Sequence, residues 1–225
     1  MDRLLKQWCI ALVGAAALGT LPACQIGALV GGAVENYKRD STHEIKAEYT
    51  GLEGKSFAVV VTADRVIQAE HPDLVRYMTQ KMTERIANNN NEPRAGGYVP
   101  AEDVLKYLYD HPAWSSRPMS ELAKDLGGVQ RLVYVEIFEY QLHDPGNQYE
   151  WDGSAGGTIA VVETDSSLPD DFAFQRQVTV KYPDKKGYGP TDMSSSSVTT
   201  VLASRFIDRT TWLMYNHQEK YYPDY

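Results

Sequence analysis

The stretch RLVYVEIFEYQL, Arg131–Leu142, decides the fold. Its residues alternate as they would on the two faces of an extended chain. One face would carry Val133, Val135 and Ile137, and the other Leu132, Tyr134, Phe138 and Tyr140. Both sets are largely apolar, and a strand that is apolar on both faces is typical of the middle of a sheet with both sides covered. The stretch therefore predicts a central strand.

The segments on either side of this strand extend the prediction. Before it, RPMSELAKDLGG (117–128) predicts a short helix that Gly127 and Gly128 end. After it, GTIAVVET (157–164) and FAFQRQVTVKY (172–182) predict two more strands, most simply an antiparallel meander. The glycine-rich GSAGG (153–157) precedes a strand, whereas phosphate loops precede a helix, so we interpret it as a flexible strand start or a bulge.

The rest of the chain supplies one more strand and three more helices. The β-branched run SFAVVVTA (56–63) predicts a buried strand, and residues 73–87 and 98–110 have helical apolar spacing. A long amphipathic helix from Val198 to Leu213 closes the chain, although Arg205 and Arg209 interrupt its apolar stripe. The predicted fold class is α/β: a single domain over residues 56–225 with a mixed β-sheet packed against amphipathic helices, in the order β-α-α-α-β-β-β-α.

The passage SELAKDLGGVQRLVYVEIFEY (120–140) resembles a "helix, Leu-Gly-Ala, strand" passage in a group of periplasmic lipoprotein domains. The group includes the TolB amino-terminal domain, the penicillin-binding-protein activator LpoB and the curli secretion lipoprotein CsgG. The resemblance covers residues 56–213 by element order and 122–135 by local pattern, with Gly127-Gly128-Val129 in place of Gly-Ala-Asp. It implies the fold and no catalytic residue, because those relatives are adaptors, regulators or assembly subunits.

The N-terminus has the parts of a bacterial export signal. Arg3 and Lys6 supply positive charge, and residues 9–21 form an apolar run too short to cross a bilayer as a helix. Leu-Pro-Ala-Cys, residues 21–24, resembles the lipobox of bacterial lipoproteins. The resemblance implies that residues 1–23 are a signal peptide and that Cys24 carries acyl chains such as palmitate. A plain cleaved signal and an uncleaved anchor are the alternatives.

The same resemblance implies where the protein is held. Gln25 follows the cysteine, where an Asp favours retention at the inner membrane, so we expect an outer-membrane lipoprotein that faces the periplasm. Residues 24–55 would be the lipidated N-terminus and tether. Within them HEIKAEY (43–49) alternates enough to form a short edge strand.

The net charge excludes some classes of partner, and the cysteine content excludes some kinds of site. The formal net charge is −8, and loss of residues 1–23 makes it more negative by one. Nucleic-acid binding needs clustered basic charge, so we expect no nucleic-acid partner. A general attraction to anionic lipid also needs basic charge, so we expect the protein to attach to the membrane only through the lipid on Cys24. After processing, Cys24 is the only cysteine, which excludes a disulfide and a cysteine-based metal site.

The sequence carries no recognisable catalytic motif. The histidines are His43, His71, His111, His143 and His217. Their spacing does not match that of metal ligands, so we expect no metal unless distant histidines converge in space. The chain also has no nucleophile elbow, phosphate loop or dinucleotide fingerprint, so we expect no catalytic residue and no cofactor. Asp64 follows the first strand, where ligands often bind in α/β sheets, but local capping is the simpler interpretation. Asp170 and Asp171 are interpreted as a solvated loop.

Tyrosine and tryptophan are the remaining unusual feature. They suit protein surfaces because they offer a large rigid area with a polar group. Those that flank turns or the tail are predicted to bind a partner: Tyr149, Trp151, Tyr221, Tyr222 and Tyr225. Three functions follow, and the third in rank, a pore subunit like the curli secretion channel, needs inserted strands of about 10 residues, which GTIAVVET is too short to supply. The first is a membrane-anchored envelope lipoprotein, a non-enzymatic adaptor, assembly or regulatory component with an envelope protein partner. The alternative is a hydrolase or glycan-modifying enzyme whose site is not visible as a motif.

Overall fold

The computed structural model describes residues 41–88 and 90–220. These residues belong to two compact units: residues 44–217, here called the body, and a small unit that includes residues 41–43 and 218–220. In the described part of the chain, no helix combines the length and the apolarity that a bilayer span requires. Cys24, Tyr221, Tyr222 and Tyr225 lie outside the described residues.

Seven strands among the described residues form two sheets. Their bounds are β1 Thr42–Ile45, β2 Ser56–Ala63, β3 Gly97–Tyr98, β4 Arg131–Gln141, β5 Gly153–Glu163, β6 Phe172–Tyr182 and β7 His217–Lys220. Strands β1 and β7 pair with each other, and the other five form a sheet in the order β3-β2-β4-β5-β6. Strand β2 is parallel to β3 and β4, whereas β5 is antiparallel to both β4 and β6. The predicted mixed sheet and antiparallel meander are confirmed.

The helices also follow the predicted order. Their bounds are α3 Arg65–Glu70, α4 Leu74–Ile86, α5 Ala101–Asp110, the 3-10 helix η1 Trp114–Ser116, α6 Met119–Asp125 and α7 Ser195–Thr211. The structure also contains short elements that were not predicted, namely α3, β3, η1 and β7. Each is too short to leave a periodic apolar pattern in the sequence.

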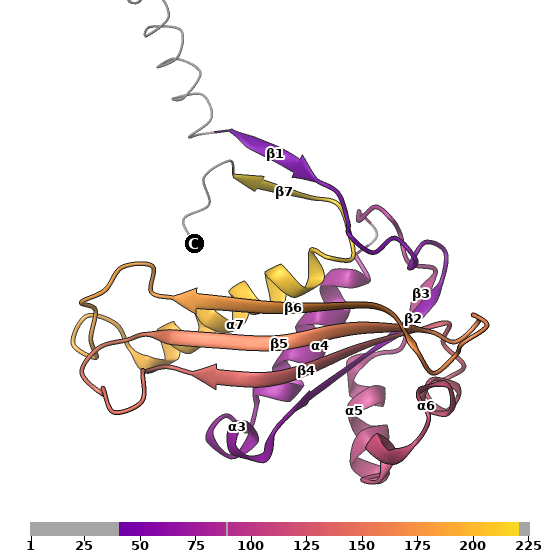
Figure 1. Cartoon of the computed structure of the whole chain (residues 1–225), viewed down its shortest axis with the longest axis horizontal. Coiled ribbons are helices and arrows are strands. Elements are labelled where there is room, and N and C mark those ends of the chain that lie inside the picture. The colour runs from indigo at the N-terminus through magenta and orange to yellow at the C-terminus, as the bar shows by residue number, and fades with distance from the viewer. Residues whose placement is uncertain (1–40, 89, 221–225) are drawn as a thin grey trace, which may run out of the picture. The chain divides into compact units, whose positions relative to one another are not determined.

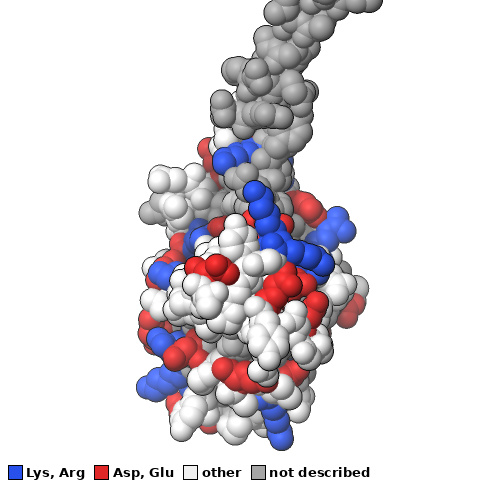
Figure 2. All heavy atoms as spheres, turned by 90° about the vertical axis from the view of Figure 1, so that its left-hand side faces the viewer, with Lys and Arg blue, Asp and Glu red and all other residues white. Residues whose placement is uncertain are grey.

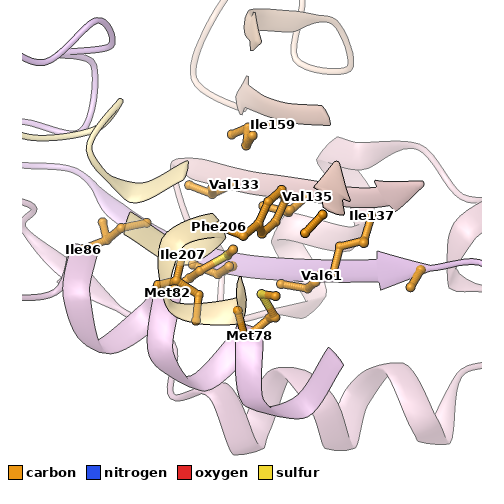
Figure 3. Close-up of a cluster of buried hydrophobic side chains, with 14 of the residues drawn as sticks. Val61, Met78, Met82, Ile86, Val133, Val135, Ile137, Ile159, Phe206 and Ile207 are labelled. Atoms are coloured by element: carbon orange, nitrogen blue, oxygen red, sulfur yellow. The ribbon is translucent and has the colours of Figure 1, made fainter. Parts of the chain in front are cut away.

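Helices cover the sheet on two sides (Figure 1). On one side, α4 and α7 pack on β2, β4, β5 and β6, and their apolar side chains form the larger core. Met78, Met82 and Ile86 from α4 meet Phe206 and Ile207 from α7 beneath the strands (Figure 3). On the other side, α5 and α6 pack on β2 and the beginning of β4, around a smaller core that contains Val104, Leu122 and, from the end of β5, Val162.

Helix α7 accommodates the arginine that interrupts its apolar stripe. Ser194 caps the helix by accepting a hydrogen bond from the Ser197 amide at 3.1 Å. The Arg205 guanidinium donates to both carboxylate oxygens of Asp184, at 2.6 and 2.7 Å, and lies over the Tyr182 ring. The arginine thus ties the helix to the loop that follows β6, with its aliphatic stem toward the core.

A β-bulge in β4 makes the side on which its last residues lie differ from the prediction. The register between β4 and β5 shifts between Ile137 and Glu139, so that Phe138 is the extra residue. The shift moves Tyr140 to the same side as Ile137, where it is 3% exposed in the larger core. Strict alternation had placed Tyr140 with Tyr134 and Phe138, and a single bulged residue reverses that assignment.

The glycine-rich segment at 153–157 is buried strand and not a loose start. Strand β5 begins at Gly153 and runs for 11 residues. A Cβ on Gly156 would lie 2.8 Å from the Phe138 ring, and one on Gly157 would lie 2.6 Å from the Phe206 ring. Two aromatic rings therefore use the space that side chains would take, one on each side of the sheet.

The core also extends N-terminal of residue 56. Tyr49 and Leu52 are 7% and 1% exposed, so the body includes residues expected to be tether. The Tyr49 hydroxyl donates to Glu163 at 2.9 Å, and its amide donates to the Leu213 carbonyl. Burial and the hydrogen bond to Glu163 raise the pKa of the Tyr49 hydroxyl. This tyrosine fastens the incoming chain to the end of β5.

A buried arginine fixes the same end of the sheet. Arg131, the first residue of β4, donates to the carbonyl oxygens of Gly51 at 2.8 Å and Gln130 at 2.7 Å. It also pairs with Asp165, which accepts from Lys55 at 2.8 Å. The hydrogen bonds from Lys55 and Arg131 hold the pKa of Asp165 below its ordinary value. One cation thus joins the incoming chain, β4 and the loop after β5.

Replacing this buried cation should destabilise the whole body. We expect Arg131→Met to lower the free energy of unfolding by about 2–3 kcal/mol, because two carbonyl oxygens lose their donor and the carboxylates of Asp165 and Glu163 lose a paired cation. Urea unfolding followed by circular dichroism measures the change. Arg176→Met is the matched control, since Arg176 pairs with Glu48 at the surface and should contribute about 1 kcal/mol or less. Equal effects for the two variants would contradict the prediction.

Candidate interaction surface

Among the described residues, one side of the sheet is uncovered over β4, β5 and β6. No described helix lies over these strands on the side that Figure 1 shows. We call this surface the open face, and its residues are Tyr134, Glu136, Phe138, Thr158, Phe172, Gln175, Gln177 and Thr179. The register aligns them across the strands, with Glu136 opposite Thr158 and Thr158 opposite Gln177. Sequence neighbours of these residues such as Val135, Ile159 and Val180 belong to the larger core on the opposite side.

Two phenylalanines stand on the open face. Phe138 is 42% exposed at the β4 bulge, where it lies against Gly156. Phe172, the first residue of β6, is 45% exposed and stacks on Tyr134 with ring centroids 6.5 Å apart. Large aromatic side chains that are half-exposed yet held by packing are suited to act as binding anchors.

The middle of the open face is polar. Glu136, Gln175 and Gln177 are exposed, and Thr158 is half-buried between them. Their carboxylate, amide and hydroxyl groups can donate and accept hydrogen bonds side by side. Burial, followed by the nearby charge of Glu136, raises the pKa of the Tyr134 hydroxyl, which keeps it a neutral donor. The surface therefore offers apolar anchors with hydrogen-bonding groups between them.

The loop before Phe172 is held in place by α6. Asp170 accepts a hydrogen bond from the Ser120 amide at 2.8 Å in the first turn of that helix. This bond lowers the pKa of the Asp170 carboxyl. Asp170 is exposed, as a solvated loop residue would be, but it also caps a helix 50 positions away in sequence, which no local pattern indicates.

A second candidate is a hollow of about 420 Å³ between the α3–α4 loop and α7. His71, Tyr77 and Thr199 are among its lining residues. His71 packs edge-on against Tyr140 with centroids 4.8 Å apart, and burial lowers its pKa, although the charge of Glu70 opposes the shift. In the described part of the chain, no hydrogen bond joins His71 to a carboxylate or a hydroxyl, the arrangement that nucleophilic hydrolysis uses.

Several other ionisable side chains of the body have local structural roles. Within residues 41–88 and 90–220, no three His, Cys, Asp or Glu side chains gather as metal ligands do. Asp64 caps α3 by accepting from the Ile67 amide at 2.8 Å, as the simpler interpretation predicted. Figure 2 looks onto the end of the body where β4 and β6 finish, and acidic and basic side chains are interspersed there.

The structure separates the two described members of the predicted aromatic set. Tyr149 is 90% exposed in the loop between β4 and β5. Trp151 is 5% exposed, stacks on His143 at 4.3 Å and donates from Nε1 to the Met193 carbonyl at 3.0 Å. Trp151 therefore fastens two loops together, and of this pair only Tyr149 is available to a partner.

The open-face residues were not singled out in the sequence. Strand β6 did carry a signal, because Gln175, Gln177 and Thr179 alternate with Phe174, Val178 and Val180. Such alternation is typical of a strand with one solvated face.

Stability measurements should separate the loop aromatics. We expect Trp151→Ala to lower the free energy of unfolding by about 3–5 kcal/mol, because it leaves a cavity and an unsatisfied Met193 carbonyl. Tyr149→Ala, the matched control in the same loop, should change it by about 0.5 kcal/mol or less. Thermal and urea unfolding measure both, and a Trp151 variant as stable as the Tyr149 variant would contradict the assignment.

Comparison with known proteins returns similar folds at low identity. No protein-family model matches the sequence, and no curated protein matches it. Lipoprotein GNA1162 from Neisseria meningitidis is 11% identical, over 69% of this chain and 96% of that chain, with a TM-score of 0.43. A variant of PelC from Paraburkholderia phytofirmans, solved as a dodecamer, is 12% identical over 77% and 98%, with a TM-score of 0.41. The LpoB C-terminal domain from Salmonella enterica is 9% identical over 65% and 90%, with a TM-score of 0.31. Lipoproteins are thus among the similar structures.

Proposed function

We propose that this protein is a lipid-anchored, non-enzymatic component of the bacterial cell envelope, an adaptor, assembly or regulatory factor. Acyl chains on Cys24 hold it at the outer membrane, and the body faces the periplasm. The open face binds one envelope protein through Phe138, Phe172 and the polar groups between them.

The observation that carries this proposal is the open face itself. Its two phenylalanines are held by packing, Phe172 on Tyr134 and Phe138 on Gly156, so little conformational entropy is lost when a partner covers them. Between them, Glu136 and Gln177 provide hydrogen-bonding groups that fix orientation. The partner that fits is a protein surface with apolar side chains at two separated points and amide or hydroxyl groups between them.

The membrane anchor follows from the chemistry of the N-terminal region. Each buried methylene contributes about 0.8 kcal/mol, so a single acyl chain binds marginally and two or three hold the protein stably. The body is acidic overall, so anionic lipid does not add general attraction. In this proposal the acyl chains provide the membrane affinity and the open face provides the partner specificity.

Photo-cross-linking in intact cells tests the open face. We expect p-benzoylphenylalanine in place of Phe138 or Phe172 to cross-link to the same envelope protein, because both rings touch one partner. The same analogue in place of Tyr109, which is 87% exposed on α5, is the matched control and should not yield that product. Phe138→Ser with Phe172→Ser should reduce recovery of the partner by about tenfold or more, as expected for two anchors. Equal recovery from all positions would refute the proposal.

Mass spectrometry of the purified protein tests the anchor. We expect the native chain to begin at Cys24 and to carry the mass of its acyl groups. Cys24→Ser should abolish both the acyl mass and cleavage at this site, because the thiol is the point of attachment. Cys9→Ser is the matched control and should change neither, since Cys9 lies in the segment that is removed. An unmodified Cys24 thiol on processed protein would rule out the anchor.

A further inference from the structure

We infer that β6 pairs edge to edge with β6 of a second copy of this chain, antiparallel and about a two-fold axis at Gln177. The inference rests on the strand alone and needs neither the lipid anchor nor the open-face partner. It joins two five-stranded sheets into one continuous sheet.

The backbone direction of β6 can be read from two contacts. The Lys181 carbonyl accepts from the Arg205 guanidinium at 2.7 Å, so it is directed away from β5. A Cβ on Gly153 would lie 2.6 Å from the Tyr182 carbonyl oxygen, so that oxygen is directed toward β5. In an antiparallel ladder, alternate residues turn both backbone groups to the same side. Lys181 is therefore an outward residue whose carbonyl is already bonded to Arg205, and the outward residues left for pairing are Gln175, Gln177 and Thr179.

These outward groups have no partner among the described residues. Strand β6 is the edge of the sheet, and no described backbone or side-chain hydrogen bond reaches the amides or carbonyls of Gln175, Gln177 or Thr179. The opposite edge, β3, is only two residues long, whereas β6 has 11. Proteins usually blunt long edges with proline, strong twists or extra charges. Within 172–182 there is no proline, and the one register shift lies at the beginning of the strand. The strand carries two charges, Arg176, which pairs with Glu48, and Lys181 near its end.

The sequence of β6 is compatible with pairing to itself. With the axis at Gln177, Gln175 lies opposite Thr179 of the second copy, and the new backbone hydrogen bonds are confined to residues 175–179, because the Lys181 carbonyl stays bonded to Arg205. The two cations fall opposite uncharged residues, Arg176 opposite Val178 and Lys181 opposite Ala173. An axis at Arg176 would instead place two guanidinium groups against each other, which destabilises a strand pair. The strand therefore favours the Gln177 register over the Arg176 register.

Pairing also extends both surfaces of the sheet. Phe174 and Val180 line the helix-covered side and come together across the new boundary, so the two larger cores become neighbours. On the opposite side, the open faces of the two copies join through Gln175, Gln177 and Thr179. The combined surface would present two copies of the Phe138 and Phe172 anchors.

Cysteine cross-linking of the full-length chain in intact cells tests the register. In Gln177→Cys, two thiols would face each other at a Cα separation of about 5.5 Å, within the disulfide range. We expect mild oxidation to convert this variant into a disulfide-linked dimer as its major species. Gln175→Cys alone should not dimerise, because its two thiols lie roughly 13 Å apart along the strands. Gln175→Cys combined with Thr179→Cys should dimerise.

Two controls separate pairing from chance collision. The native chain gives the background from Cys9 and Cys24, and Tyr109→Cys gives the collision rate of an exposed thiol on α5. A Gln177→Cys dimer no more abundant than the Tyr109→Cys dimer would overturn the inference.

A charge swap provides a second readout without cysteines. Differently tagged Gln177→Lys and Gln177→Glu chains should co-purify about fivefold better than two Gln177→Lys chains, because opposite charges then face each other at the axis. Equal recovery would also overturn the inference. If the Gln177→Cys dimer forms but the analogues at Phe138 and Phe172 cross-link to no partner, the result contradicts the proposed function and leaves the strand pairing supported.

Discussion

Parallel pairing of β2 and β4 is the constraint on which the rest of the body depends. A parallel pair needs a crossover between its strands, and here the crossover carries α3, α4, α5 and α6. The chain uses these helices to cover both sides of β2 and of the beginning of β4, because these segments are apolar on both faces. The antiparallel strands β5 and β6 have no such crossover, and α7 covers only one of their sides. The open face is what remains uncovered.

The same constraint explains how much of the fold could be predicted. Runs that are apolar on both faces identified β2 and β4, and the predicted bounds of β2 and β6 agree with the structure. The bulge at Phe138 could not be predicted, because it depends on the glycines of a strand paired later in the chain. The burial of Tyr49 also depends on remote partners, Glu163 and the Leu213 carbonyl.

The candidate surface was less predictable than the fold. Alternation in β6 indicated a solvated side, but whether α5 and α6 would extend over it depends on tertiary packing alone. The loop aromatics show the converse. Tyr149 and Trp151 are two residues apart, and the sequence did not distinguish them. Trp151 is nevertheless buried, because it bonds to the Met193 carbonyl and stacks on His143. Composition can identify residues suited to binding, but long-range contacts decide which of them reach the surface.

The missing side chain at residue 156 has a consequence for how this surface can change. The Phe138 ring rests where a Cβ would stand, so the height of an exposed aromatic group above the sheet is set from the neighbouring strand. A methyl group at that position would lift or tilt the ring while the phenylalanine itself stayed in place. A substitution at residue 156, which the partner does not contact, can thus change the shape of the surface that the partner binds. Binding specificity can then change in evolution while the contact residues stay the same.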